Sequence, residues 1–268
     1  MHQNYWLENL LSNPRDFVDS FYKQGKYYSK IKEWHKNNKE RKNPRSYYVF
    51  TLDEEDAKRN ATFSTFEFGI KEHMIRRGYV LKIGSLLPMN TLKESLFKFA
   101  GVQIEENVFI APEVTIDPVL RGWTRFHKGC SIGWGARFFN HLFEENGRVV
   151  LGYIEVGEES SLGGFVSVSP GVTIGKKANI GAEVKIGPGV TIGDNAKIGA
   201  GALLSPFVTI GEGAEVGIGS FISESVSPHT KVQGNPAKII EEKIRDRKPK
   251  LDLIINQNLD NKDNQAMP

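Results

Sequence analysis

A six-residue period of aliphatic residues dominates this chain, running from Val156 to Ile222 through twelve successive hexads without a slip. Glycine follows most of these aliphatic residues, and small or β-branched residues precede most of them by two positions. A period of six fits neither the 3.6 of a helix nor the 2 of an ordinary strand. It fits short strands joined by turns, where glycine adopts backbone angles that other residues avoid. The pattern therefore predicts a parallel β-helix. The aliphatic positions are Val156, Leu162, Val168, Ile174, Ile180, Ile186, Ile192, Ile198, Leu204, Ile210, Val216 and Ile222.

The same register extends toward the N-terminus, with two interruptions. It begins with Ile104, Ile110 and Ile116, but the next aromatic core position, Phe126, lies ten residues after Ile116. This spacing indicates a four-residue insertion within residues 117–122. Residues 140–153 are too polar for regular strands, so we predict that they form a loop that projects from one coil. Loops on a rigid scaffold often carry function.

The segments on either side of the repeat lack the six-residue period. We predict a mostly helical N-terminal region over 1–100, in which residues 90–97 form a capped helix leading into the first coil. The β-helix then occupies 101–236. Residues 237–268 are predicted to hold a short helix over 237–245, which covers the open end of the solenoid, and a disordered tail.

Composition limits the class of protein. Of 268 residues, 39% are hydrophobic and 25% are charged, as in soluble globular proteins, and a net charge of +3 gives no argument for nucleic acid. Cys130 is the single cysteine, so no intramolecular disulfide can form, which fits a reducing compartment. No apolar run reaches the roughly 18 residues of a membrane span, and the first thirty residues lack a signal-peptide core. We therefore predict a cytoplasmic protein.

Three segments add to the hexads a resemblance to the hexapeptide-repeat acyltransferases. They are the His141 segment, residues 170–175 (Pro-Gly-Val-Thr-Ile-Gly) and residues 234–238 (Gly-Asn-Pro-Ala-Lys). The resemblance spans roughly 90–238 and is greatest to the sugar O-acetyltransferases, such as the galactoside, maltose and nodulation enzymes. It implies an all-β, left-handed parallel β-helix with three hexads per coil. It also implies a homotrimer whose active sites lie between two subunits.

His141 is the candidate catalytic residue among six histidines. It stands where the repeat breaks into the polar loop, as a catalytic histidine does in the galactoside and maltose acetyltransferases. The resemblance implies that His141 is the general base that deprotonates an acceptor hydroxyl for direct attack on the thioester of acetyl-CoA. The alternative is a structural histidine at the base of a loop. The usual His-Pro of that family is His141-Leu142 here, which leaves the loop conformation open.

Several residues near His141 are candidates to complete the site. By analogy with catalytic triads, Glu144, Glu145 or Glu155 would orient the imidazole, and the sequence does not decide among them. Glu144 is also a candidate for contact with the acceptor. Asn140 either binds the acceptor or caps the turn.

Two tryptophans are further candidates for the acceptor site. Trp134 and Trp123 precede the polar loop by about one coil. Either could stack on the face of a sugar ring or pack at a subunit contact.

A column of small residues is the candidate site for acetyl-CoA. Gly164, Ala182 and Ala200 are 18 residues apart, so in successive coils they stack at about 4.8 Å. A groove without side chains would expose backbone amides to the pantetheine arm, and Gly163 or Gly164 could stabilise the oxyanion. Lys238 would meet the carrier's phosphates. The alternative is that small residues only suit tight turns.

These features predict transfer of an acetyl group from acetyl-CoA to a hydroxyl of a sugar or sugar-containing acceptor. Three alternatives stay open. One is an amino-sugar N-acetyltransferase, and another is an acyl-carrier-protein-dependent acyltransferase that docks its carrier on the basic stretch 30–45. The third is a non-catalytic scaffold, in which His141 would be replaceable. No two histidines have the spacing that a zinc site of this fold needs, so no metal is expected.

Overall fold

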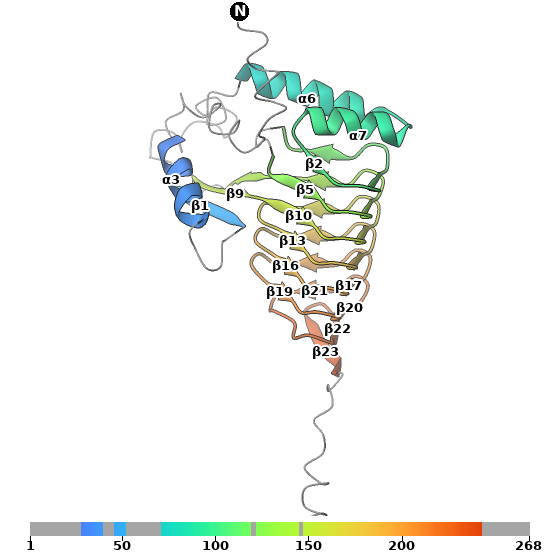
Figure 1. Cartoon of the computed structure of the whole chain (residues 1–268). Helices are drawn as coiled ribbons and strands as arrows, with labels where there is room; N and C mark the ends of the chain where they lie inside the picture. The colour runs from blue at the N-terminus through green and yellow to red at the C-terminus, as the bar shows by residue number, and fades with distance from the viewer. Residues whose placement is uncertain (1–27, 40–45, 52–70, 119–121, 145–146, 243–268) are drawn as a thin grey trace, which may run out of the picture.

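The computed structural model describes the chain over residues 28–39, 46–51, 71–118, 122–144 and 147–242. Its body is a solenoid of three parallel sheets, in which each coil gives one short strand to each sheet (Figure 1). Paired residues in neighbouring coils are 18 apart, as in Ser161 with Asn179 and Val168 with Ile186. Three hexads therefore make one coil, and the predicted left-handed parallel β-helix is confirmed.

The strands are named in chain order. The first sheet contains β2 (Gln103–Ile104), β5 (Thr124–Phe126), β10 (Ile154–Val156), β13 (Thr173–Ile174), β16 (Thr191–Ile192) and β19 (Thr209–Ile210). The second contains β3 (Phe109–Ile110), β6 (Ser131–Ile132), β11 (Ser161–Leu162), β14 (Asn179–Ile180), β17 (Lys197–Ile198), β20 (Glu215–Val216), β22 (Thr230–Gly234) and β23 (Ala237–Glu242). The third contains β4 (Thr115–Ile116), β7 (Arg137–Phe138), β12 (Ser167–Val168), β15 (Lys185–Ile186), β18 (Leu203–Leu204) and β21 (Phe221–Ile222).

The aliphatic hexad residues form the core inside the coils. In each regular two-residue strand the second residue is buried and the first faces outward, because successive side chains point to opposite faces of a strand. The buried series runs as one cluster from Ile104 to Val232. One aliphatic residue per hexad is therefore enough to fill the interior of the solenoid.

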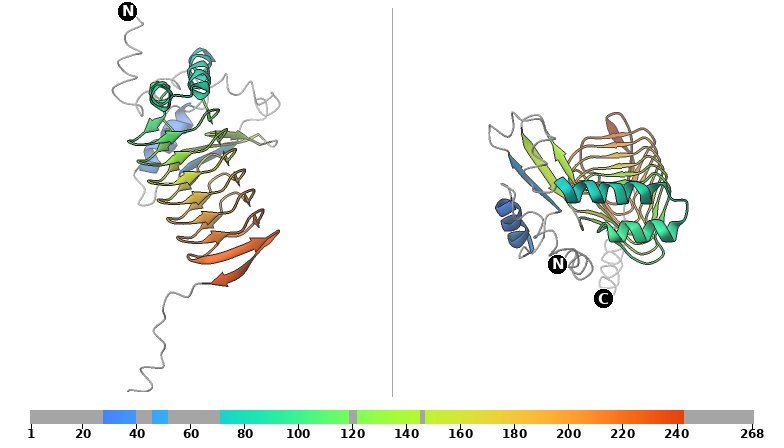
Figure 2. Two further views of the ribbon diagram at one scale, coloured as in Figure 1. Left: turned by 90° about the vertical axis from the view of Figure 1, so that its right-hand side faces the viewer. Right: turned by 90° about the horizontal axis from the view of Figure 1, so that it is seen from above.

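Two helices close the N-terminal end of the solenoid, α6 (Lys71–Leu86) and α7 (Asn90–Phe99) (Figures 1 and 2). The predicted helix over 90–97 is confirmed and is two residues longer, but the predicted side-chain cap is wrong, because Met89 is the N-cap residue and makes no cap hydrogen bond. Asn90 is its first residue, and its side chain bonds Val108 O and Ile110 N at 2.9 Å, so it ties the helix to the first coil. Lys93 is buried beside it, and its Nζ donates to Ile110 O at 2.7 Å.

The C-terminal end is closed by a strand, so the predicted helix over 237–245 is wrong for residues 237–242. β23 pairs antiparallel with β22, the last strand of the second sheet. The unpaired edge of β22 offers backbone hydrogen bonds to residues 237–242, whereas an isolated short helix is only marginally stable. The strand is therefore favoured over the helix. The predicted disordered tail lies outside the described residues.

An antiparallel sheet stands beside the solenoid, in the order β1-β9-β8. It joins β1 (Tyr47–Thr51) to a hairpin of β8 (His141–Phe143) and β9 (Arg148–Gly152). The excursion over 140–153 is thus confirmed, but the prediction that it is too polar for strands is wrong, because Val149, Val150 and Leu151 are buried. The described N-terminal part is mostly helical as predicted, since it contains α3 (Tyr28–Lys39) in addition to α6 and α7, but β1 was missed. No described helix is both long and apolar enough to cross a bilayer.

Candidate active site

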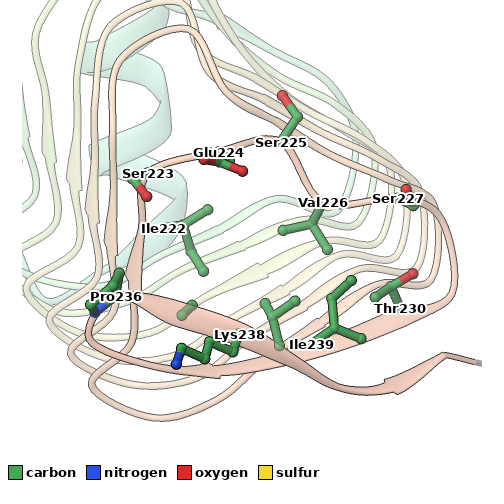
Figure 3. A pocket seen from close by; sticks show the side chains of 12 residues that line it. Ile222, Ser223, Glu224, Ser225, Val226, Ser227, Thr230, Pro236, Lys238 and Ile239 are labelled. Atoms are coloured by element: carbon green, nitrogen blue, oxygen red, sulfur yellow. The ribbon is translucent and has the colours of Figure 1, made fainter.

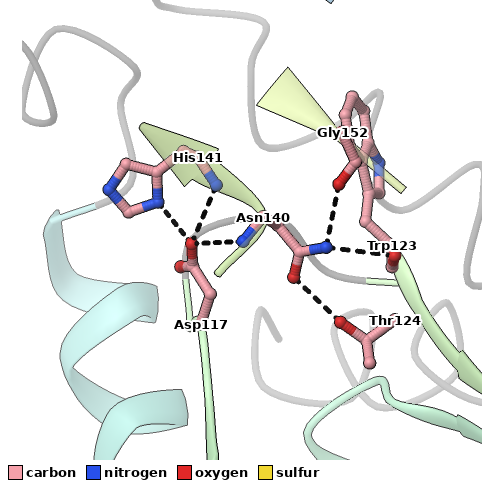
Figure 4. Close-up of polar contacts among 6 residues, drawn as sticks. All are labelled: Asp117, Trp123, Thr124, Asn140, His141 and Gly152. Atoms are coloured by element: carbon pink, nitrogen blue, oxygen red, sulfur yellow. Dashed lines mark hydrogen bonds and ion pairs between the residues drawn. The ribbon is translucent and has the colours of Figure 1, made fainter. Parts of the chain in front are cut away.

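The four-residue insertion delivers a buried carboxylate to His141. Asp117 directly follows β4, and 1% of its side chain is exposed. Its Oδ2 accepts the backbone N–H groups of Asn140 and His141, at 3.0 and 3.2 Å, and also contacts His141 Nδ1 (Figure 4). One carboxylate oxygen therefore holds both the backbone and the imidazole of the catalytic candidate.

This contact sets the tautomer of His141. An ionised carboxylate can only accept, so Nδ1 is the donor and the neutral ring keeps its lone pair on Nε2. One quarter of the side chain is exposed, at 25%, and the ring of Phe143 lies edge-on to it at 5.4 Å between centroids. The imidazole is thus fixed on one side and accessible to a substrate.

The surroundings of His141 raise its pKa. Burial acts against the charged imidazolium, but the negative charge and the hydrogen bond of Asp117 outweigh it, and the pKa lies above its usual value. A base with a raised pKa accepts a proton readily, provided that the pH is high enough to keep it neutral.

Asn140 belongs to the scaffold of the site. It is fully buried, and its Nδ2 donates to Trp123 O at 3.1 Å and to Gly152 O at 2.9 Å. Its Oδ1 accepts the hydroxyl of Thr124 at 2.9 Å. These bonds fix the base of the hairpin and favour the turn-stabilising role over contact with the acceptor.

The candidate acids near His141 lie elsewhere. Glu144 faces Arg148, with 3.7 Å between the charged atoms, and Glu155 lies on the first sheet at 4.0 Å from His127. Glu145 lies outside the described residues. Sequence reasoning missed Asp117, although the register slip gave a signal, because a charged residue follows Ile116 where glycine usually follows the aliphatic residue.

The two candidate tryptophans have different environments. Trp123 is buried and stacks on Tyr153, with ring centroids 4.2 Å apart, while Trp34 of α3 lies 6.1 Å away. This cluster packs α3 against the hairpin and leaves Trp123 out of reach of a sugar. Trp134 is 46% exposed, and its carbonyl accepts the Phe165 amide at 2.7 Å at the top of the small-residue column.

The column of small residues lies on one corner of the solenoid, as predicted. The coils approach so closely that a Cβ on Gly163 would lie 2.5 Å from Ala182 N. The carbonyls of Gly164 and Ala182 accept amides of the next coil at 2.8 Å, whereas no described group accepts the N–H of Gly164, Ala182 or Ala200. Gly163 N already donates to Ile180 O at 2.8 Å, so Gly164 is the better oxyanion donor.

The terminal motif lies at the end of this corner. Gly234 N donates to Ser220 Oγ at 3.1 Å, and a Cβ on Gly217 would meet Gln233, so the motif continues the same stack. Lys238 is exposed on β23. With Pro236 it lines a cavity of about 310 Å³ at the C-terminal end of the solenoid (Figure 3).

The two halves of the candidate site occupy different corners of one chain. His141 follows β7, where the third sheet passes to the first, and Gly164 follows β11, where the second sheet passes to the third. A whole face of the solenoid, the third sheet, separates them. Within one subunit the base and the carrier groove therefore do not meet.

Neither a metal centre nor a cysteine nucleophile is found in the described part of the chain. No three His, Cys, Asp or Glu side chains gather there as metal ligands would. Burial raises the pKa of the Cys130 thiol to about 12, so the thiol stays protonated near neutral pH.

Comparison with known proteins agrees with the repeat. Residues 171–206 and 189–224 match the family model described as bacterial transferase hexapeptide (six repeats), which covers the central coils. No curated protein matches the chain.

Solved structures match part of the chain at low identity. A mutant of AntD, an N-acyltransferase from Bacillus cereus in complex with dTDP and coenzyme A, is 19% identical with a TM-score of 0.46, covering 63% of this chain and 95% of its own. The hexapeptide-repeat acetyltransferase VCA0836 from Vibrio cholerae is 16% identical with a TM-score of 0.43, covering 66% and 93%. The polySia-specific acetyltransferase NeuO is 19% identical with a TM-score of 0.35, covering 54% and 73%. These likenesses carry no argument about substrate.

Proposed function

We propose that this protein is a cytoplasmic enzyme that transfers an acetyl group from acetyl-CoA to a hydroxyl of a sugar or sugar-containing acceptor. The observation that carries the proposal is the pair of His141 with the buried Asp117, which holds the imidazole in the tautomer that a general base requires. The resemblance in the three sequence motifs supports the choice of donor and acceptor. Thiol release from acetyl-CoA, followed over a panel of sugars and amino sugars, tests it. Turnover with amines alone would instead indicate the N-acetyltransferase.

The arrangement supports a direct transfer. His141 Nε2 removes the proton of the acceptor hydroxyl, and the oxygen attacks the thioester carbonyl. The Gly164 N–H stabilises the resulting oxyanion, which collapses by breaking the carbon–sulfur bond. His141 then returns the proton to the departing thiolate, so the products are the acetyl ester and coenzyme A. Asp117 keeps the imidazole oriented and stabilises its charged form.

A homotrimer with active sites between subunits accounts for the two separate corners. The hairpin of one subunit, with His141, would face the column of Gly164, Ala182 and Ala200 on its neighbour. Lys238, at the end of that column, would meet the phosphates of the carrier. Trp134, exposed at its top, stays a candidate for contact with the acceptor.

Mixed trimers test the shared site. Subunits with His141→Ala and subunits with Ala182→Phe are each expected to be inactive alone. Unfolded and refolded together in equal amounts, they should recover activity, because about a quarter of the shared sites combine an intact base with an intact groove. Activity is measured by thiol release. Recovery would fail if each site were built from one chain, and refolded wild type controls for losses during the procedure.

The Asp117→Asn variant should change the pH dependence of turnover. Because His141 must be neutral to act, activity rises with pH through its pKa, which Asp117 raises. Without that negative charge the pKa falls, so the acidic limb of the kcat profile should move to lower pH. The plateau should also drop by about tenfold or more, because the amide no longer stabilises the imidazolium. An unshifted acidic limb would contradict the assigned pair.

A further inference from the structure

An exposed apolar ridge lies on the helices that close the N-terminal end. Tyr79, Ile83 and Leu86 of α6 are 68%, 56% and 59% exposed, and Met89 in the connection to α7 is 63% exposed. We call these four residues the α6 ridge. The outward face of a helix on a soluble protein is normally polar, so a ridge of this kind marks an interaction surface.

The α6 ridge lies on the side of α6 opposite to the one that packs on the solenoid. At 100° per residue, Tyr79, Ile83 and Leu86 share one side of α6, while the buried Leu81 and Ser85 lie on the other side. The buried side is held in place, because Ser85 O accepts the backbone amide of Glu113 at 2.7 Å. Figures 1 and 2 show α6 lying across the end of the solenoid. The ridge therefore lies parallel to the end face.

The charge around the ridge is positive. Lys82 is exposed on the same side of α6, between Tyr79 and Ile83. The basic side chains of residues 77–100 that are not buried are Arg77, Lys82 and Lys98, against the single acid Glu94, which pairs with Lys98 at 2.5 Å. Apolar side chains with a tyrosine and interspersed lysine are the composition that inserts into a lipid headgroup region.

We propose that the α6 ridge docks on an anionic lipid surface. A second copy of the chain is a poorer occupant, because a two-fold contact would bring each Lys82 against the same positively charged face of its partner. Anionic headgroups complement that charge, while the acyl boundary accepts Ile83, Leu86 and Met89. In the trimer proposed above, three ridges would lie at the same end and bind one surface together.

Sedimentation with vesicles tests the proposal independently of catalysis. The protein is expected to bind phosphatidylcholine vesicles that contain phosphatidylglycerol, more weakly as salt rises, and to bind pure phosphatidylcholine poorly. The double variant Ile83→Ser/Leu86→Ser should lose binding by about tenfold or more, and Lys82→Glu should also weaken it. The matched control Ile239→Ser/Ile240→Ser, which removes two exposed aliphatic side chains at the opposite end, should bind like wild type.

Three results would overturn the proposal. They are wild type that fails to bind anionic vesicles at low salt, ridge variants that bind as well as wild type, and a control that loses binding equally. Light scattering without vesicles checks the other occupant. A mass that doubles for wild type but not for Ile83→Ser/Leu86→Ser would assign the ridge to a second copy instead. Circular dichroism of each exposed-site variant verifies that it is folded.

Discussion

Replacing His141 by alanine is expected to lower kcat for acetyl transfer by roughly 10²–10⁴-fold, the usual contribution of a positioned general base. The affinity for acetyl-CoA should stay within about twofold of wild type, because the backbone amides of the small-residue column and Lys238, which are proposed to hold the carrier, are unchanged in this variant. Stopped-assay thiol release gives kcat, and isothermal titration with acetyl-CoA gives Kd. A fall in kcat at constant Kd would separate the base from the groove.

His127 provides the matched control for this experiment. It is a partly exposed histidine on the first sheet whose Nδ1 lies 3.1 Å from Glu105, away from the Asp117 contact. His127→Ala should leave kcat within about twofold of wild type. If His141→Ala turned over as fast as His127→Ala, the general-base assignment would be lost and the scaffold alternative would gain.

Filling the small-residue column should have the second large effect. Ala182→Phe places a ring over the backbone amides of the column, which would block the pantetheine arm and cover the amide donors. We expect the Kd for acetyl-CoA to rise by roughly 10–100-fold or more, as expected from lost hydrogen bonds together with steric exclusion. Isothermal titration measures this change directly.

A substitution on another face controls for general damage. Thr191→Phe adds the same ring at an exposed strand position of the first sheet, away from the column corner. It should bind acetyl-CoA like wild type. If Ala182→Phe and Thr191→Phe bound acetyl-CoA equally well, the column would not be part of the carrier site, whatever the outcome for His141.

The strict hexad made the architecture predictable. Each aliphatic residue, such as Ile174 or Ile192, points inward for a local reason, since its strand alternates faces and its turn follows at once. The same step repeats in every coil, so residues 18 apart, such as Gly164 and Ala182, stack on each other. No contact between segments distant in sequence is needed to predict this. The solenoid could therefore be predicted from the spacing, and the column from the spacing together with the three hexads per coil that the resemblance implied.

The residues around the base could not be read in this way. Asp117 and His141 are 24 residues apart and meet only because one coil and an insertion bring β4 beside the start of the hairpin. The apolar run Val149–Leu151 becomes a strand because β1, a hundred residues earlier in the chain, pairs with it. Because Asp117 is distant from His141 in the sequence, the sequence pointed only to the acids near His141 as partners of the imidazole.

What the sequence by itself determined is the left-handed β-helix, its core, the small-residue column and His141 at the break in the repeat. The parallel β-helix and its core follow from periodicity, which acts between neighbours along the chain, whereas the left hand, the three hexads per coil and the role of His141 were implied by the family resemblance. Tertiary structure alone decided the Asp117 contact, the scaffold role of Asn140, the burial of Trp123 and the strand at 237–242. Each of these depends on which strand edge or buried polar group a segment contacts in the folded chain. A buried backbone or side-chain polar group without a hydrogen-bond partner costs free energy, so such groups pair with the partners that the fold places beside them.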